Sequence, residues 1–562
     1  MAILFKEVCD IFCKIESTTK RLEKMEYFID LIKLVENKGA PQDLKKICQI
    51  AIGRVFAEHE NKELGIGPNI LIDAIISTGI NKKTLQSTIN QTGDIGTAIE
   101  QLGHNIKQTS LFQTPPTLEE VYNTLKKLST IEGGQSQKKK IRHISSILIK
   151  SSPIEQRYLA RLILEDMRIG MSIPTILGAF SNYYNYPKEN LEKIYAVVND
   201  IGLLAEKLAQ RCDIYNEEEL QLKIFRPIKP MLAQLVGSIN DAIIEMGAPQ
   251  FETKYDGARV QIHKKDNEVK IYSRKLEDIT NSIPEIAEEV KKIGAQNLII
   301  EGECVAMDKN GRPRPFQDIL RRFRRKYNIE SIQSEINLKV YVFDILYYND
   351  KSLIDLPLIE RRSTLEKILA NKYNKLNMSH KLTTDNEQKA REFYEWSLSI
   401  GHEGVMIKNP NAPYTPGSRV RTMYKFKPTL ESLDVVITRA KMGMGKRKEW
   451  YGSFEIAVKD YENNLYTIGH VGSGLTEEEL HYLTEQIKNI TTEVINDEAI
   501  VEPKIVLELS YEEIQESDKY KCGYALRFPR VARIRTDKSI EDINSIEDIE
   551  RIFDIQKGKG YK

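Results

Sequence analysis

Glu252-Thr253-Lys254-Tyr255-Asp256-Gly257-Ala258-Arg259 places a lysine between a short predicted strand and an Asp-Gly pair, which is typical of hairpin turns. A lysine amine attacks only when it is deprotonated, and its ordinary pKa is about 10.4. Burial or a nearby positive charge such as Arg259 would lower the pKa of a lysine and activate it. The stretch therefore suggests a nucleophilic Lys254 held at a sheet edge. A solvated lysine in a surface turn is the simpler interpretation of these residues alone.

The composition describes a soluble multidomain protein of 562 residues, enough for about three or four domains. No run of about 18 apolar residues is available to cross a membrane, and the first residues do not form a signal peptide. We therefore expect a cytoplasmic monomer without membrane contacts. The six cysteines are too scattered to indicate a disulfide framework or a four-cysteine zinc site.

The charge is balanced overall but clustered locally. The net charge is only +1, which by itself neither favours nor excludes nucleic acid. Basic patches at 138–140, 321–326, 446–448 and 527–538 are what a phosphate-binding surface requires. The first patch follows a Gly-Gly pair, so free N–H groups at the start of a basic helix could bind a phosphate. A serine-capped helix with a solvated lysine face explains the same residues equally well.

The spacing of apolar residues changes twice along the chain. Up to about residue 220 it is helical. Two prolines within 226–233 indicate a linker, after which strands and helices alternate. Beyond about residue 430, short strands with Gly-rich turns surround one helix, which fits a small barrel of OB type. We expect an all-α domain at 1–225, an α+β domain at 226–429 and a C-terminal β-barrel OB-fold domain at 430–562.

Charged side chains on the predicted strands describe a site for a metal-bound polyphosphate. Glu303 and Glu403 are hard oxygen ligands, and Mg²⁺ is usually shared between one or two carboxylates and phosphate oxygens. Lys425 and Lys427 alternate on one strand and could neutralise phosphates, while Phe343 could stack on a base. No Walker-type loop is present. Each of these residues singly has an ordinary structural explanation, but their order within one domain weakens it.

With these motifs the chain resembles ATP-dependent DNA ligases of the archaeal and eukaryotic replicative type, over nearly its whole length. No single motif is specific, but six or seven in a fixed order are. The family's nucleotidyltransferase motifs are matched by Lys254-Tyr255-Asp256-Gly257, Ser273-Arg274, Glu301-Gly302-Glu303, Val342-Phe343-Asp344, Glu403-Gly404-Val405-Met406-Ile407-Lys408, Lys425-Phe426-Lys427 and Arg533-Ile534-Arg535-Thr536-Asp537-Lys538.

The resemblance implies a reaction and a role for each matched residue. Lys254 would attack the α-phosphate of ATP and become adenylated, the AMP would pass to the 5′-phosphate at a DNA nick, and the 3′-hydroxyl would displace it. It implies that Glu252 lies beside the adenine, that Phe343 stacks on it, and that Arg259, Arg274 and Arg419 contact the nucleotide. Glu303 and Glu403 would contact Mg²⁺ or Mn²⁺ and the ribose, and Lys425 and Lys427 would contact the α-phosphate. Arg535 and Lys538 would reach the pyrophosphate after the barrel closes.

The resemblance also implies partners. The helical domain would bind nicked double-stranded DNA mainly through phosphates, in replication, repair and recombination. The segment 108–112 resembles the short motif with which archaeal ligases bind the replication sliding clamp, through Gln108, Leu111 and Phe112, although a second aromatic is missing. Read from its residues alone, the segment is more simply a buried loop anchor.

Four alternatives stay open. An RNA ligase or an RNA-capping guanylyltransferase would not need the long helical domain, and Glu252 is placed to favour adenine. An NAD-dependent ligase would be expected to carry a four-cysteine zinc site. A nick-binding scaffold without catalysis is disfavoured because every charged motif residue is intact.

Overall fold

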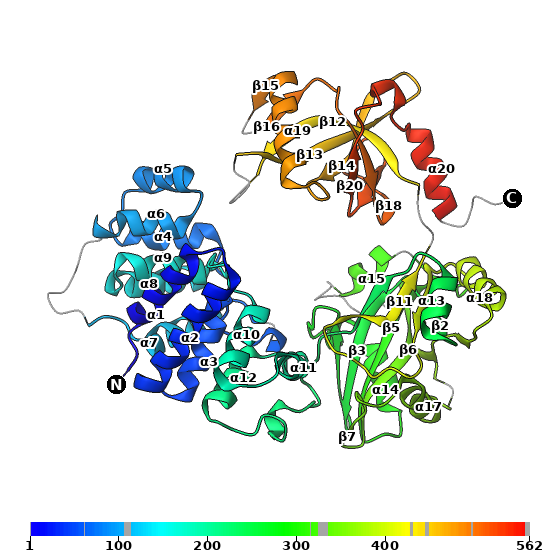
Figure 1. The fold of residues 1–562 in the computed structure, drawn as a ribbon, viewed down its shortest axis with the longest axis horizontal. Coiled ribbons are helices and arrows are strands. Elements are labelled where there is room, and N and C mark those ends of the chain that lie inside the picture. The colour runs from blue at the N-terminus through cyan, green and yellow to red at the C-terminus, as the bar shows by residue number, and fades with distance from the viewer. Residues whose placement is uncertain are drawn as a thin grey trace. The chain divides into compact units, whose positions relative to one another are not determined.

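The computed structural model describes residues 2–60, 62–105, 114–314, 316–323, 335–371, 373–427, 431–443, 449–495 and 498–556 (Figure 1). The chain divides into two compact units. One comprises Met1–Arg391 and Met406–Lys425, and the other comprises Glu392–Val405 and Phe426–Lys562. Within the described ranges, no helix is long and apolar enough to cross a membrane.

The N-terminal region is helical, as the apolar spacing predicts (Figure 1). Prolines at the first turn of several helices fit there because the first N–H groups of a helix have no partner within it. Its helices are α1 Phe5–Ser17, α2 Arg21–Lys38, α3 Pro41–Ala51, α4 Pro68–Ser77, α5 Lys82–Thr92, α6 Ile95–Leu102, α7 Leu118–Ser129, α8 Ser136–Lys150, α9 Pro153–Ile163, α10 Ile173–Tyr184, α11 Lys188–Val198 and α12 Ile201–Ala209.

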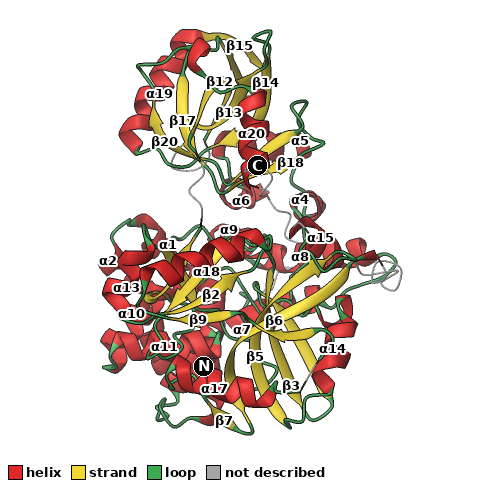
Figure 2. Cartoon of the chain, turned by 90° about the vertical axis from the view of Figure 1, so that its right-hand side faces the viewer, coloured by secondary structure: helices red, strands yellow, loops and turns green. Residues whose placement is uncertain are grey.

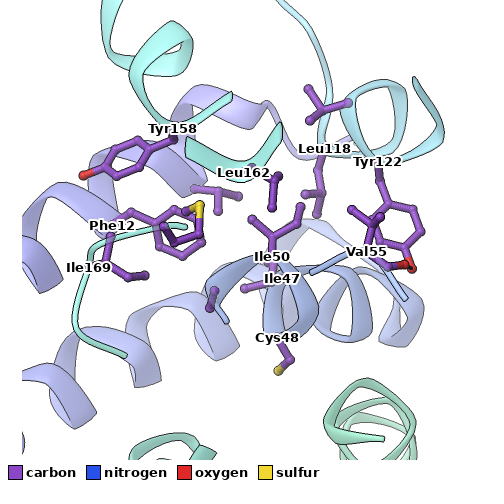
Figure 3. Packing of buried hydrophobic residues seen from close by; sticks show 14 of the residues in the cluster. Phe12, Ile47, Cys48, Ile50, Val55, Leu118, Tyr122, Tyr158, Leu162 and Ile169 are labelled. Atoms are coloured by element: carbon purple, nitrogen blue, oxygen red, sulfur yellow. Dashed lines mark hydrogen bonds between the residues drawn. The ribbon is translucent and has the colours of Figure 1, made fainter. Parts of the chain in front are cut away.

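One apolar core joins these helices (Figure 3). Phe12 of α1 packs edge to face against Tyr158 of α9, with ring centroids 5.7 Å apart. Ile47 of α3 and Leu162 of α9 are fully buried in the same cluster. Burying one such side chain contributes roughly 1.5–3 kcal/mol, so the helical region has the core of a domain.

The middle of the chain contains two β-sheets. One has the strand order β1-β11-β10-β2-β9, and the other has the order β4-β3-β5-β6-β7 with β8 beside β6. Helix α14 covers the second sheet, with its apolar face on a core that also includes β3 and β5 (Figure 2). The elements are β1 Leu232–Leu235, α13 Ile239–Met246, β2 Gln250–Lys254, β3 Ala258–Lys265, β4 Glu268–Ser273, α14 Pro284–Lys291, β5 Asn297–Met307, α15 Phe316–Phe323, β6 Asn337–Tyr348, β7 Lys351–Ser352, α17 Leu358–Ile368, β8 Leu376–Met378, β9 Lys381–Thr383, α18 Glu387–Ser399, β10 Gly404–Lys408 and β11 Arg419–Phe426.

The predicted hairpin at Asp256-Gly257 is wrong. Strand β2 pairs with β9, while β3 pairs with β4 and β5, so the chain passes from one sheet to the other at this point. Strand β2 is also an internal strand, which places Lys254 at a strand end rather than at a sheet edge. Gly257 is required here because the backbone of β5 comes too close for a side chain. A Cβ there would lie 2.7 Å from the carbonyl oxygen of Cys304 on β5.

The C-terminal part is β-rich, as expected, and more elaborate than five strands and one helix. The seven described strands of its main sheet are joined by a two-stranded sheet, β18-β19, and by a C-terminal helix that the sequence pattern did not reveal. Its elements are β12 Leu433–Met442, β13 Tyr451–Lys459, β14 Leu465–Val471, α19 Glu477–Ile490, β15 Thr491–Ile495, β16 Glu498–Val501, β17 Val506–Ser510, β18 Glu513–Glu516, β19 Tyr524–Arg527, β20 Arg530–Ile534 and α20 Ile546–Gln556.

Candidate active site

Strand β2 carries two of the predicted site residues. Glu252 and Lys254 are two positions apart, so their side chains leave the same side of the strand. Glu252 is only 2% exposed, whereas Lys254 at the strand end is half-buried. The fully buried Phe251 anchors the opposite side of the strand. The strand therefore presents a buried carboxylate and a more accessible amine in one direction.

Glu252 lies at the centre of a buried polar cluster. Its carboxylate accepts hydrogen bonds from Lys408 Nζ at 3.0 Å and Ser379 Oγ at 3.1 Å, and from Gln250 Nε2 at 2.6 Å. Arg362 Nη1 lies 4.0 Å from the same carboxylate. Sequence reasoning assigned no role to Lys408 or Arg362. A lysine in a buried strand needs an anionic partner, so the position of Lys408 in the sequence could have predicted such a pair.

Two cations lie near the ring of Phe343 on β6. Lys408 Nζ is 4.6 Å from the centre of its half-buried ring, and the guanidinium carbon of Arg259 is 5.4 Å from it. Cations are attracted to the electron-rich face of an aromatic ring, and the attraction is stronger when water is excluded. The structure thus brings Glu252, Arg259 and Phe343 together, and it adds Lys408 as the residue that joins the carboxylate to the ring.

Arg259 is held by groups that the sequence did not reveal. Its guanidinium donates to Glu301 at 2.6 Å, to the hydroxyl of Tyr414 at 3.2 Å and to the carbonyl of Met231 at 2.8 Å. Burial works against its charge, but Glu301, Tyr414 and Glu303 together more than offset this and raise the pKa of Arg259. Its Nε–H is buried and has no hydrogen-bond partner among the described residues.

The two predicted metal ligands are both half-buried. Glu303 of β5 is half-buried and lies opposite Arg259 on β3, and Glu403 is a half-buried residue directly before β10. The described residues contain no group of three metal-ligating side chains that could hold an ion by themselves. Mg²⁺ commonly takes one or two carboxylates and completes its shell with phosphate oxygens and water. Glu303 fits such a partial ligand set.

The other predicted nucleotide contacts lie on less buried positions. Arg274 directly follows β4 and Arg419 begins β11, and both are exposed. Lys425 and Lys427 are half-buried at the end of β11, where Phe426 between them contacts the ring of Tyr394 at 4.8 Å. The packing of Phe426 fixes the end of the strand from which the two lysines extend.

Arg535 and Lys538, in the C-terminal unit, share one carboxylate. Asp434 accepts from Lys538 Nζ at 2.6 Å and from Arg535 Nη1 at 3.3 Å, and Glu508 lies 3.2 Å from the same guanidinium. The carboxylate of Asp537 accepts two hydrogen bonds from Arg535, and this pairing raises the pKa of the arginine. The two cations thus have acidic partners within their own unit.

With this geometry established, comparison with known proteins gives a consistent result. Three family models match in chain order: "DNA ligase N terminus" at residues 4–181, "ATP dependent DNA ligase domain" at 230–427 and "ATP dependent DNA ligase C terminal region" at 447–538. A DNA ligase of Methanococcus aeolicus is 95% identical over 560 residues and covers 100% of both chains. The chain belongs to the ATP-dependent DNA ligases.

More distant relatives of this ligase also align end to end. A DNA ligase of Methanocaldococcus jannaschii is 63% identical over 574 residues, which cover 99% of this chain and 100% of that one. A DNA ligase of Thermococcus onnurineus is 38% identical and covers 96% of each. These matches confirm the predicted resemblance and set the four alternatives aside.

A solved structure has the same fold as the ligase. The structure of Pmar-Lig_PreS3 matches with a TM-score of 0.59 and 17% identity, over 94% of this chain and 99% of that chain. At this identity the match shows the fold alone: a helical N-terminal region, an α+β domain and a β-rich C-terminal domain.

The helical region of the ligase departs from one prediction about its basic patch. Lys140 is buried and donates to the carbonyls of Leu64 at 2.8 Å and Gly65 at 3.2 Å, so it is a structural residue. Lys138 and Lys139 are exposed on α8. The helix is not serine-capped: its N-cap residue is Gln135, with a left-handed backbone and no side-chain cap bond. Residues 108–112, 324–326 and 446–448 lie outside the described residues.

Proposed function

We propose that the ligase seals nicks between a 5′-phosphate and a 3′-hydroxyl in duplex DNA through an AMP bound covalently to Lys254. The observation that carries this proposal is the arrangement around Phe343. A half-buried aromatic ring lies beside the buried pair Glu252 and Lys408 and beside Arg259, whose Nε–H has no partner among the described residues. Lys254 leaves β2 on the same side as Glu252.

The chemistry assigned to these residues balances as three displacements. The Nζ of Lys254 attacks the α-phosphorus of ATP, a P–N bond forms, and pyrophosphate leaves. The 5′-phosphate of the nick then displaces Lys254 and takes the AMP, and the 3′-hydroxyl finally displaces AMP to form the phosphodiester. Each step spreads negative charge over phosphate oxygens, which fixed cations stabilise.

The remaining site residues are proposed to bind and orient the reactants. Glu303 and Glu403 would hold Mg²⁺, which neutralises phosphate charge when bound, or Mn²⁺ in its place. Lys425, Lys427, Arg274 and Arg419 would contact the nucleotide. Arg535 and Lys538 would exchange Asp434 for the pyrophosphate, because the two ligands are anionic oxygens that compete for the same donors.

The proposal also includes the domain limits and the binding partners of the ligase. The domain limits 1–225, 226–429 and 430–562 follow from the sequence, and nicked DNA would bind the helical domain in replication, repair and recombination. A sliding clamp would bind through Gln108, Leu111 and Phe112. We further propose a monomer that acts in the cytoplasm.

The decisive experiment is self-labelling. Full-length ligase incubated with Mg²⁺ and ATP labelled at the α-phosphate should retain label, and Lys254→Ala should retain none. Lys265→Ala is the matched control, because Lys265 is an exposed lysine on the next strand, β3. Label on the Lys254→Ala protein would overturn the assignment. Repeating the assay with ADP, GTP and NAD determines which nucleotides are accepted.

A further inference from the structure

The linker before the α+β domain is fastened to one side of strand β3. Arg259, Gln261 and His263 alternate along β3, so their side chains leave the strand on the same side. Each is hydrogen-bonded to the backbone of residues 225–231: His263 to Phe225, Gln261 to Ile228 and Arg259 to Met231. The linker, called the strap from here on, therefore runs along β3 in the opposite direction.

The strap has five backbone N–H groups, and residues of the α+β domain bind three of them. Pro227 and Pro230 lack an N–H group. The N–H of Phe225 donates to His263 Nδ1 at 2.9 Å, and that of Ile228 donates to Gln261 Oε1 at 2.9 Å. The N–H of Met231 donates to the hydroxyl of Tyr414 at 3.1 Å. Pairing at three points along the strap indicates a fixed segment rather than a flexible tether.

The hydrogen bonds allow one arrangement of protons. Because His263 Nδ1 accepts from Phe225, the ring proton is on Nε2, which donates to Gln261 Oε1 at 2.9 Å. The amide of Gln261 then donates through Nε2 to the carbonyl of Ile228 at 3.3 Å and to Glu301 at 3.1 Å. His263 is fully buried and Gln261 is 4% exposed. A buried network in which every member is paired specifies a single geometry.

The network ends at the candidate nucleotide site. Glu301 is 1% exposed and accepts from Gln261, from Tyr414 at 2.9 Å and from Arg259 at 2.6 Å. Arg259 in turn lies over the ring of Phe343. The position of the strap and the position of the Arg259 guanidinium are thus set by the same carboxylate.

We infer that His263 and Gln261 are positioning residues for the nucleotide site: they fix the strap on β3, and the strap and Glu301 together hold Arg259 against Phe343. The linker is then a part of the adenylation machinery. This inference rests on the proposed function, because it assigns Arg259 to the nucleotide.

The test compares three substitutions in the full-length ligase. His263→Leu removes the acceptor for Phe225 with little change of shape, and His263→Asn keeps an acceptor near the position of Nδ1. Tyr272→Phe is a milder change that deletes only the hydroxyl donating to the carbonyl of Phe225 at 3.0 Å. Lys265→Ala, exposed on the same strand, is the control. The readouts are the ATP concentration for half-maximal self-adenylation and hydrogen exchange of the peptide spanning 222–232.

The expected result is a coupled change in both readouts. His263→Leu should raise the half-maximal ATP concentration at least fivefold and speed exchange in the strap, and His263→Asn should restore both to within about twofold. Tyr272→Phe should shift both by about two- to threefold, and it decides the case if His263→Leu does not fold. Faster exchange with an unchanged ATP requirement would overturn the inference. If the unmodified ligase itself takes no label, the proposed function fails instead.

Discussion

Glu252 Oε2 lies 3.0 Å from Lys408 Nζ, and the two side chains are 2% and 10% exposed. The residues are far apart in the chain but adjacent in one sheet, on β2 and β10. Removing one member of a buried ion pair leaves an uncompensated charge, which costs about 3–5 kcal/mol. The pair therefore stabilises the fold only as a unit, and it fixes the carboxylate proposed to meet the adenine.

Lys408→Met should lower the free energy of unfolding by about 3 kcal/mol, because Glu252 would stay buried without its ammonium partner. Glu252→Gln should cost a similar amount. The double variant should lose clearly less than the sum, since neither charge is then left alone. Denaturant unfolding of the four proteins measures this coupling. Strictly additive losses would show that the two residues are energetically independent.

Acid should destabilise the ligase through His263. Burial lowers its pKa in the folded protein to about 3, from 6.5. Below pH 6.5 the unfolded chain binds a proton that the folded protein refuses, so this stabilising contribution is complete above pH 6.5 and is lost as the pH falls toward 3. At pH 5 the loss is about 2 kcal/mol.

The measurement is the difference in unfolding free energy between pH 7 and pH 5. Other groups titrate in this range, so the comparison is with His263→Leu, which lacks the imidazole. The charged group nearest in the network is Glu301, reached through Gln261, and the ring of Tyr272 packs on the imidazole with centroids 5.0 Å apart. An equal pH dependence in both proteins would contradict the prediction.

Lys538→Ala should slow self-adenylation more than it slows the sealing of a pre-adenylated nick. The ammonium is proposed to leave Asp434 for the pyrophosphate, which is present only in the first step. Losing one preorganised donor to developing charge costs about 100-fold in rate. Single-turnover assays of the two steps measure the ratio, with Lys441→Ala as the control, since Lys441 is an exposed lysine of β12 paired with Glu498. Equal losses in both steps would remove the proposed role.

Phe112→Ala should weaken clamp binding with little effect on sealing when no clamp is present. An aromatic anchor in a partner's pocket typically contributes 2 kcal/mol or more, so the dissociation constant should rise about 30-fold. Titration of the ligase with the clamp measures this, and Tyr215→Ala controls for loss of an exposed aromatic of the helical region. Unchanged affinity would exclude the segment as the clamp site.

Local sequence patterns predicted most of the regular structure. The short strands and the single helix predicted beyond residue 430 are present, among them β13, β14 and α19. The pattern missed α20, although its Ile549, Ile552 and Phe553 have helical spacing and are buried. It also gave a hairpin at Asp256-Gly257, because an Asp-Gly pair indicates a reversal and carries no information on which strands pair afterwards.

The sequence by itself determined the family of the ligase and the order of its helical, α+β and β-rich parts, and it supplied the residue types of the phosphate-binding site that we propose around Lys254. These follow from periodicity and motif order, which are local properties. Only the tertiary structure decided that Lys408 pairs with Glu252, that Arg259 is held by Glu301 and the strap, and that Asp434 binds both Arg535 and Lys538. Partners of buried charges are set by the register of strands distant in sequence, and by the cost of leaving any one of those charges unpaired.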